Sequence, residues 1–270
     1  MLTKNIGAIA GDIIGSVHEH AGTKTKVFDL FTPRSRFTDD TVLTIAVADA
    51  LLHGRDYVDA FHVYFSAYPH AGYGRSFMQW ARQCERQPYN SYGNGSAMRV
   101  SPIAYAFESL VEVLDEAERC AAVTHNHPEG IRGAQAVAAA VFMARTGKDK
   151  SQIKKLVHET FGYDLSRSVD SIRDTYEFDV TCQGTVPEAI IAFLESTDFE
   201  DAIRNAISLG GDADTLACIT GAIAEAFYGG VPIDVLQGVE SRLDNELRGV
   251  LIAFQIRFAT TALRNRLLNR

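Results

Sequence analysis

Residues 37–41 read FTDDT and stand at the start of an apolar, helix-forming run that continues to residue 53. Residues 210–215 read GGDADT and stand in the same position before a second apolar run. Asp and Thr are favoured at helix N-caps, so capping explains either stretch alone. Each stretch, however, holds more oxygen ligands than one cap needs, and hard cations such as Mg²⁺ prefer oxygen ligands. Together the two stretches predict a metal site, provided that they meet in space.

The chain around these stretches has 270 residues, of which 46% are hydrophobic and 22% are charged. These proportions are typical of a globular protein with a large core, and we predict one domain over residues 1–270. The net charge of −8 argues against binding of nucleic acid or an anionic membrane through the whole surface. No apolar stretch approaches the roughly 20 residues that are needed to span a bilayer.

The four cysteines, Cys84, Cys120, Cys182 and Cys218, form no CxxC pair. Neither a zinc site nor a redox pair is therefore indicated. Their apolar, helical surroundings predict buried thiols in a reducing compartment. The N-terminus lacks a basic segment followed by an apolar run and a cleavage site, so we predict a cytoplasmic protein.

Residues 6–20 are predicted to form the first helix, in which glycine recurs at every fourth position. These glycines share one helix face, which indicates close approach of either another backbone or a ligand. Both interpretations stay open at this stage. Asp12 and Glu19 are seven residues apart and would lie on one side of such a helix.

The rest of the chain also has helical periodicity, with no convincing alternation typical of strands. We predict an all-α fold of about twelve helical segments, with a loop at residues 21–37 that could move over a site. The predicted helices after the first are residues 40–53, 56–68, 74–86, 97–107, 110–124, 128–145, 151–161, 165–176, 188–195, 198–209, 215–227, a short helix from Pro232, and much of 242–268.

A glycine-rich turn, YNSYGNGS at residues 89–96, precedes one of these helices. It does not fit the GxGxxG dinucleotide fingerprint, and no predicted strand comes before it. Backbone N–H groups of such a turn can bind a phosphate at a helix N-terminus. A plain turn with Asn94 or Ser96 as the N-cap is equally consistent. His125 and His127 lie in another turn, where hydrogen bonding is a better explanation than zinc.

The chain resembles the ADP-ribosylglycohydrolases, a family that includes the ADP-ribosyl-acceptor hydrolases and the enzyme that reactivates dinitrogenase reductase. The matching segments occur in the family's order and cover nearly the whole chain. They are GAIAGDIIGSVHE at 7–19, FTDDT at 37–41, SYGNGSAMR at 91–99, TH at 124–125 and GGDADT at 210–215. The resemblance implies a compact all-α, multi-helix fold and a centre that holds two Mg²⁺ ions, with Mn²⁺ as a possible substitute.

The resemblance also implies an activity and a set of site residues. The expected reaction is the removal of ADP-ribose from modified protein side chains, either arginine- or serine-linked, or from related O-linked compounds. Glu19 would act near the scissile bond, with the metal-bound Asp39 and Asp212 as alternative acids or bases. The implied metal ligands are Thr38, Asp39, Asp40, Asp212, Asp214 and Thr215. The implied substrate-binding residues are Ser91, Tyr92, Gly93, Asn94, Gly95 and His125, and Tyr89 is a candidate for stacking on the adenine.

Two other classes of function fit the sequence less well. A non-catalytic ADP-ribose-binding protein or toxin-immunity protein would be expected to have lost Glu19 or one of the aspartates, and all are present here. An all-α phosphohydrolase would need a His-Asp pair and further histidine ligands, whereas these stretches offer Thr and Asp only. The expected partners are ADP-ribose and an ADP-ribosylated protein. No segment reads as a dedicated interface, so we expect a monomer.

Overall fold

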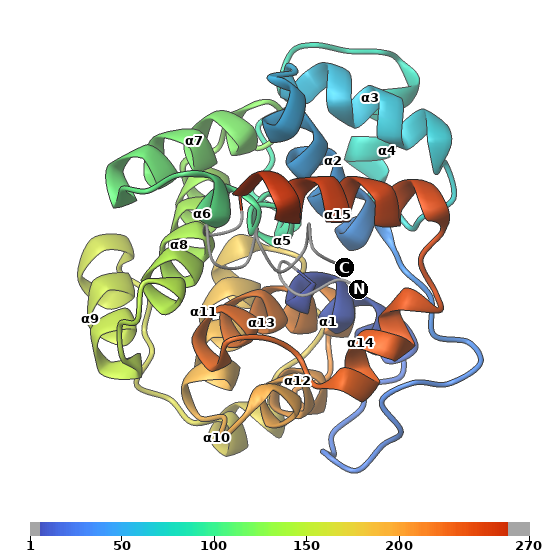
Figure 1. Ribbon diagram of the computed structural model, residues 1–270. Coiled ribbons are helices and arrows are strands. Elements are labelled where there is room, and N and C mark those ends of the chain that lie inside the picture. Colours follow the sequence, from blue (N-terminus) through green and yellow to red (C-terminus); the bar gives the residue numbers. More distant parts are fainter. Residues whose placement is uncertain (1–5, 259–270) are drawn as a thin grey trace.

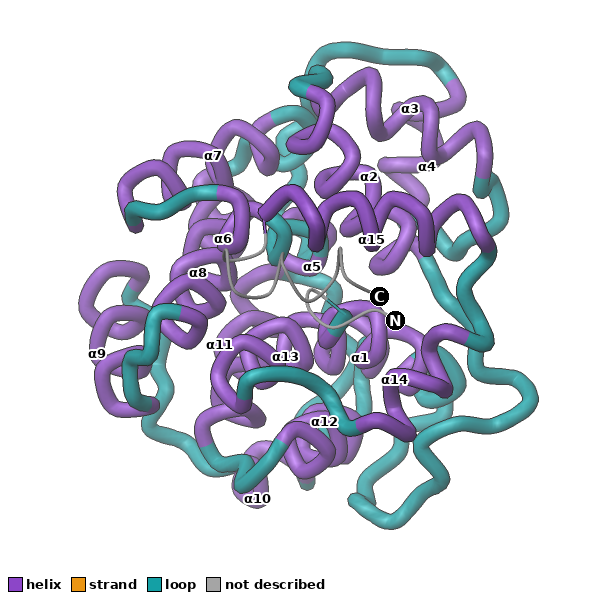
Figure 2. The backbone as a smooth tube through the Cα atoms, in the orientation of Figure 1, coloured by secondary structure: helices purple, strands orange, loops and turns teal. Residues whose placement is uncertain are grey.

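The computed structural model describes residues 6–258, which form fifteen α-helices and no strand (Figure 1, Figure 2). The predicted all-α fold is confirmed. The helices are α1 (Gly7–Gly15), α2 (Asp39–His53), α3 (Tyr57–Ala67), α4 (Arg75–Arg82), α5 (Gly95–Met98), α6 (Ile103–Ala106), α7 (Leu110–Ala122), α8 (Pro128–Arg145), α9 (Lys150–Phe161), α10 (Val169–Arg173), α11 (Cys182–Leu194), α12 (Phe199–Ser208), α13 (Ala213–Tyr228), α14 (Ile233–Glu240) and α15 (Asn245–Phe258).

Helices α1 and α13 lie side by side at the centre of the molecule (Figure 1). A Cβ on Gly7 would lie 2.2 Å from the carbonyl oxygen of Gly221, and one on Gly11 would lie 1.9 Å from that of Ala217. Any side chain larger than hydrogen would push the two backbones apart. The first-helix glycines therefore serve close helix packing, which settles one of the two open interpretations.

The other helices surround this central pair. Helices α8, α11 and α12 pack against α13, whereas α2 packs against α1 and is covered by α3 and α15. Nearly all of the buried apolar side chains of residues 6–258 form one contiguous core. The assignment of one domain to residues 1–270 stays a prediction, because the chain ends lie outside the described residues. Within residues 6–258, no helix is both long and apolar enough to cross a bilayer.

The capping residues in the sequence predicted many helix ends correctly. Thr38 caps α2, accepting a hydrogen bond from the Asp40 N–H, and Gly54 ends that helix in the left-handed conformation. The prediction for α8 matches at both ends, with Pro128 in its first turn.

Several predicted helices were wrong in extent. The first ends at Gly15 instead of residue 20, so Glu19 lies in the following turn and the predicted helical relation to Asp12 was wrong. Residues 97–107 divide into the short helices α5 and α6, residues 74–86 shorten to α4, and residues 165–176 shorten to α10. The last predicted helix begins at Asn245 and is described to Phe258, so its end lies outside the described residues.

Helix α11 begins six residues before its predicted start at Glu188. Its N-cap is Thr181, whose Oγ1 accepts a hydrogen bond from the Gly184 N–H. Pro187 lies inside the helix instead of before it. Proline is tolerated best in the first turn of a helix, where its missing N–H breaks no hydrogen bond. Pro187 therefore suggested a helix start beside it, although the helix begins earlier. Of the four cysteines, three are buried as predicted, and Cys84 is exposed.

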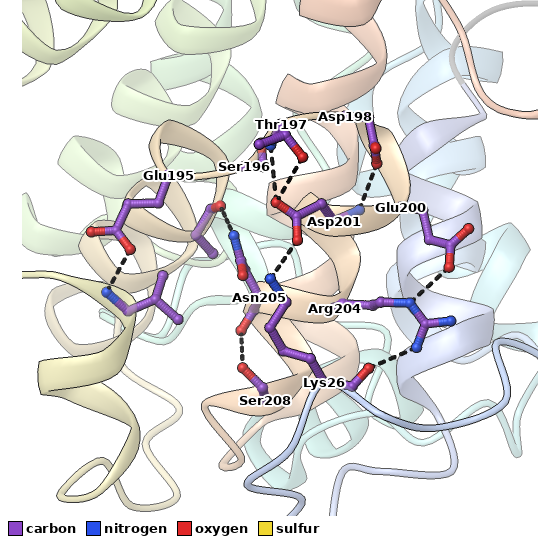
Figure 3. A network of polar contacts seen from close by, with 12 residues as sticks. Lys26, Glu195, Ser196, Thr197, Asp198, Glu200, Asp201, Arg204, Asn205 and Ser208 are labelled. Carbon is purple, nitrogen blue, oxygen red and sulfur yellow. Dashed lines mark hydrogen bonds and ion pairs between the residues drawn. The ribbon is translucent and has the colours of Figure 1, made fainter.

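The loop at residues 21–37 is anchored on α10 and α12 rather than free. The Lys24 ammonium donates to the carbonyl oxygens of Arg173, Tyr176 and Leu209, each at 2.6 Å. Figure 3 shows the second anchor, in which Lys26 pairs with Asp201 of α12. These contacts hold the loop beside the segment that leads into residues 210–215.

Candidate active site and metal centre

The two acidic stretches meet at the N-termini of α2 and α13. A Cβ on Gly15 would lie 2.5 Å from the Asp214 Cα, so the end of α1 touches the start of α13. The Thr215 hydroxyl donates to Asp40 Oδ2 at 3.3 Å and thereby joins the stretches directly. The geometric condition for a shared metal site is therefore met.

Asp12 lies beneath this junction and was not among the predicted site residues. It is fully buried on α1 and accepts from the Thr38 N–H at 2.9 Å and the Thr38 hydroxyl at 2.6 Å. It also accepts from the Thr41 N–H at 3.1 Å and from the Thr41 hydroxyl. Asp12 thus holds the first turn of α2 in place. The only signal in the sequence is a charged residue within an otherwise apolar and glycine run.

The carboxylates fall into two groups that could each hold an ion. Oxygens of Asp12, Asp40 and Asp214 lie within 4.8 Å of one another. Oxygens of Glu19, Asp212 and Asp214 form a second group by the same measure. Asp214 belongs to both groups, so one carboxylate is shared between two sets of oxygens of the kind that hard cations prefer.

The electrostatics of these groups call for a positive charge. Burial raises the pKa of Asp40 well above its usual range, and the nearby Asp12, Asp39 and Asp212 raise it further. Burial and the neighbouring carboxylates act in the same direction on the pKa of Asp214. Asp40 Oδ1 is buried without a hydrogen-bond partner in the described structure. A buried, unpaired carboxylate oxygen is costly, so this donor set fits hard divalent cations.

Asp39 has a different environment from Asp40. It belongs to neither carboxylate group but faces the pocket, where a Cβ on Gly72 would lie 3.4 Å from Asp39 Oδ1. Burial and the charge of Asp12 raise its pKa well above the usual value. Its role as a metal ligand stays a prediction.

Asn94 stands at the N-cap position of α5, but its side chain bonds Asp212. Its Nδ2 donates to Asp212 Oδ2 at 2.7 Å and to Thr185 Oγ1 at 3.1 Å, and it makes no capping bond to α5. The N-cap interpretation was therefore right about the position of Asn94 but not about the bond that its side chain makes. An amide so placed fixes the orientation of the Asp212 carboxylate.

The glycine-rich turn has fewer free N–H groups than the sequence indicated. The Gly93 N–H donates to Ser91 Oγ at 3.1 Å, and the Asn94 N–H donates to the Val180 carbonyl at 2.8 Å. The helix after the turn, α5, has only four residues. Phosphate binding by a helix N-terminus is therefore weakly supported here, and the turn contributes mainly its shape.

A pocket of about 330 Å³ joins the carboxylates to this turn. Its volume lies within the range of small-molecule sites, roughly 300–1,000 Å³. The predicted site residues that line it are Glu19, Thr38, Asp39, Asp40, Ser91, Gly93, Asn94, Gly95, His125, Asp212, Asp214 and Thr215. Tyr89 lines it too, as do residues that were not predicted, including Arg36, Phe77, Arg99 and Phe178.

Tyr92 is the predicted residue that the structure does not bring to the pocket. Its side chain is 49% exposed, and its ring centroid lies 5.2 Å from that of His127. Its carbonyl accepts from the Cys182 N–H at 2.9 Å, which ties the turn to the start of α11. Substrate binding by Tyr92 stays a prediction.

Glu19 and His125 both line the pocket, and their pKa values are shifted in opposite directions. The Glu19 side chain is 32% exposed, and burial raises its pKa. Burial lowers the pKa of His125 well below its usual value, and the charge of Arg99 lowers it further. A carboxyl that holds a proton more readily than usual therefore faces a pocket that also contains a neutral imidazole.

Comparisons with known proteins agree with this architecture. The family model described as ADP-ribosylglycohydrolase matches residues 5–264. ADP-ribosylhydrolase ARH3 from Homo sapiens is 29% identical, over 83% of this chain and 84% of that protein. ADP-ribosylarginine hydrolase Tri1 from Pseudomonas putida (strain GB-1) is 26% identical, over 87% of this chain and 72% of that protein.

A solved structure has a related fold. A chain of an "ADP-ribosylglycohydrolase-related protein complex" superposes with a TM-score of 0.65, covering 94% of this chain and 98% of that chain. At 24% sequence identity, this likeness speaks for the fold alone.

Proposed function

Because the chain belongs to the ADP-ribosylglycohydrolase family, we propose that it hydrolyses the bond between the anomeric carbon of ADP-ribose and a side chain of a modified protein. The named relatives ARH3 and Tri1 are an ADP-ribosylhydrolase and an ADP-ribosylarginine hydrolase. The observation that carries the proposal is one pocket that combines two carboxylate groups with a glycine-rich turn.

The carboxylate groups would hold two divalent cations, Mg²⁺ or Mn²⁺. The proposed ligands are Thr38, Asp39, Asp40, Asp212, Asp214 and Thr215. When bound, such ions supply Lewis acidity and a water of lowered pKa. Asp12 and Asn94 would keep the donor set in place, since each hydrogen-bonds a neighbour or a member of it.

Glu19 is the proposed general acid or base. Its raised pKa lets it carry a proton closer to neutrality than an ordinary glutamate, and it lies within reach of Asp212 and Asp214. Cleavage of a glycosidic bond develops positive charge on the sugar, and a proton must reach the leaving side chain. The carboxylates near the sugar would also favour that positive charge, with Asp39 and Asp212 as alternative proton carriers.

The remaining pocket residues would bind the ligand without taking part in proton transfer. Ser91, Gly93, Gly95 and His125 line the pocket together, with His125 Nε2 close to both glycines. Tyr89 offers an aromatic face there, with its ring centroid 5.9 Å from that of His125. We propose that this end holds the diphosphate and adenosine of ADP-ribose.

The test measures free ADP-ribose released from arginine-linked and serine-linked ADP-ribosyl peptides, with Mg²⁺ and again with EDTA. Metal-dependent release from either peptide supports the proposal and identifies the acceptor. Glu19→Gln should reduce release while calorimetric affinity for ADP-ribose is retained. Tight binding of ADP-ribose with no release from any peptide would favour the non-catalytic alternative, an ADP-ribose-binding or toxin-immunity protein. A monomer in the cytoplasm stays our expectation, and sedimentation can check the oligomeric state.

A further inference from the structure

Arg99 is a buried cation beside the pocket. It follows α5, is 0% exposed, and its guanidinium carbon lies 4.3 Å from the centroid of the Phe61 ring. Its Nη2 donates to the Cys120 carbonyl at 3.0 Å and to the Thr124 hydroxyl at 2.8 Å. Its Nε and Nη1 have no hydrogen-bond partner in the described structure. A charge buried at such a cost calls for an explanation beyond packing.

The Thr124 hydroxyl links Arg99 to His125. Arginine can only donate, so Arg99 occupies one lone pair of Thr124 Oγ1. His125 Nδ1 lies 2.7 Å from the same hydroxyl oxygen. In that bond Nδ1 accepts if the ring proton is on Nε2, and it donates if the proton is on Nδ1.

The charge of Arg99 selects between these two arrangements. An imidazole turns its lone pair toward a cation and its N–H away from it. Nδ1 is the nitrogen on the side of Arg99, because Nδ1 and the Arg99 guanidinium contact the same hydroxyl oxygen of Thr124. The electrostatics therefore favour a lone pair on Nδ1 and the ring proton on Nε2.

His125 Nε2 points at the glycine-rich turn. It lies 3.5 Å from the position that a Cβ on Gly93 would take and 3.4 Å from that on Gly95. Both glycines line the pocket together with His125. The Nε2–H is thus a donor at the wall of the pocket, close to a backbone with no side chain to cover it.

We propose that Arg99 and Thr124 are positioning residues, which hold His125 in its Nε2–H tautomer so that Nε2 donates a hydrogen bond to an oxygen of the bound ligand. The ligand oxygen, from a phosphate or a ribose of ADP-ribose, rests on the proposed function. The tautomer itself does not. A donor fixed in this way loses no binding energy to tautomer selection when the ligand arrives.

The first experiment records long-range ¹H–¹⁵N correlation spectra of the ligand-free protein with ¹⁵N-labelled histidine. The chain has eight histidines, and His125→Gln assigns the signal of interest. We expect a protonated Nε2 and an unprotonated Nδ1 for His125 in the wild type. Thr124→Val should mix the two tautomers, whereas Thr124→Ser, which keeps the hydroxyl, should restore the wild-type pattern.

The second experiment measures ADP-ribose affinity by calorimetry in the same variants. We expect Thr124→Val to weaken binding about tenfold, as for one ordinary hydrogen bond, and Thr124→Ser to restore it. Thr220→Val is the matched control, because Thr220 is equally buried and its hydroxyl donates to the Ala189 carbonyl at 2.9 Å. It should change neither the tautomer nor the affinity.

Two results would overturn the proposal. One is a protonated Nδ1 on His125 in the wild type. The other is an unchanged tautomer or affinity in Thr124→Val. A wild type that shows the expected tautomer but binds no ADP-ribose would instead overturn the proposed function, since the spectra are recorded without ligand.

Discussion

The molecule has two regions rich in carboxylates, and they differ in how the negative charge is balanced. Around α12, Asp201 pairs with Lys26 and accepts from the Thr197 N–H at 2.9 Å, and Glu200 accepts from Arg204 at 2.7 Å (Figure 3). In the pocket, burial and other carboxylates raise the pKa of both Asp40 and Asp214, and a hydrogen bond from Thr215 only partly offsets this for Asp40. In the first region the carboxylates pair with cations, whereas no described side chain forms an ion pair with Asp40 or Asp214.

The pKa values of the carboxyls in the two regions are therefore shifted in opposite directions from the usual value. Burial of Asp201 opposes ionisation, but Lys26 and Thr197 outweigh it and lower its pKa. Burial raises the pKa of Asp214, and the charges of Asp40 and Asp212 raise it further. Surface carboxylates with partners stabilise the fold modestly, whereas crowded buried ones indicate a ligand of opposite charge.

The largest expected effect comes from removing the carboxylate that both metal groups share. Asp214→Asn should reduce metal-dependent ADP-ribose release by about a hundredfold or more, because even outer partners of metal ligands are worth roughly 10–100-fold. The rise in melting temperature on adding Mg²⁺ should disappear with it. Asp201→Asn, which changes a paired carboxylate, should retain both. Full release and a full Mg²⁺ response in Asp214→Asn would remove this residue from the metal centre.

The close contact of α1 and α13 is what crowds the pocket carboxylates. Gly11→Ala should destabilise the protein by about 1–3 kcal/mol, because its Cβ meets the backbone of α13. Gly249→Ala is the control: this exposed glycine of α15 has nothing near its Cβ position, so alanine should stabilise by about 1 kcal/mol. Urea unfolding measures both. Equal stability of the two variants would mean that α1 can move away from α13 without cost.

In EDTA, the stability of the two regions should depend on pH with opposite sign. A carboxyl with a raised native pKa stays protonated in the native state after the unfolded chain has lost its proton. Asp40 should therefore destabilise the protein increasingly as pH rises above about 4, the usual aspartate value. Asp40→Asn should reduce this decline, and saturating Mg²⁺ should reduce it as well.

Asp201 should act in the other direction. Its lowered pKa stabilises the native state above the unfolded value of about 4, and this contribution is lost as pH falls through the native pKa. Asp201→Asn should make the free energy of unfolding less dependent on pH, and only on the acid side. Urea unfolding across the pH range measures both slopes, and slopes of the same sign would contradict the contrast between the regions.

The smallest expected effect concerns the lysine that pairs with Asp201. Lys26→Met should cost about 0.5–1 kcal/mol, because the Lys26 side chain is 39% exposed and water screens the pair. The Mg²⁺ response should stay unchanged. A loss of that response would show that the anchored loop at residues 21–37 supports the metal centre directly.

The sequence predicted those features that depend on neighbours along the chain. Thr38, Gly54 and Pro128 act within one helical turn, so their positions mark helix ends without knowledge of the rest. The two acidic stretches were recognised in the same way, by local composition. Where the local signal was ambiguous, as at Pro187 in α11, the predicted helix end was wrong.

Only the tertiary structure decided what the local patterns left open. Whether the first-helix glycines meet a ligand or a helix depended on α13, some 200 residues away. Asp12 bonds Thr38, and Asn94 bonds Asp212. The partners in each pair lie far apart in the sequence, so the spacing of residues along the chain could not predict these roles. Composition and caps determined an all-helical chain with two acidic helix starts, because those signals are local. The pocket exists because folding packs α1 against α13 and so brings the two acidic starts into contact.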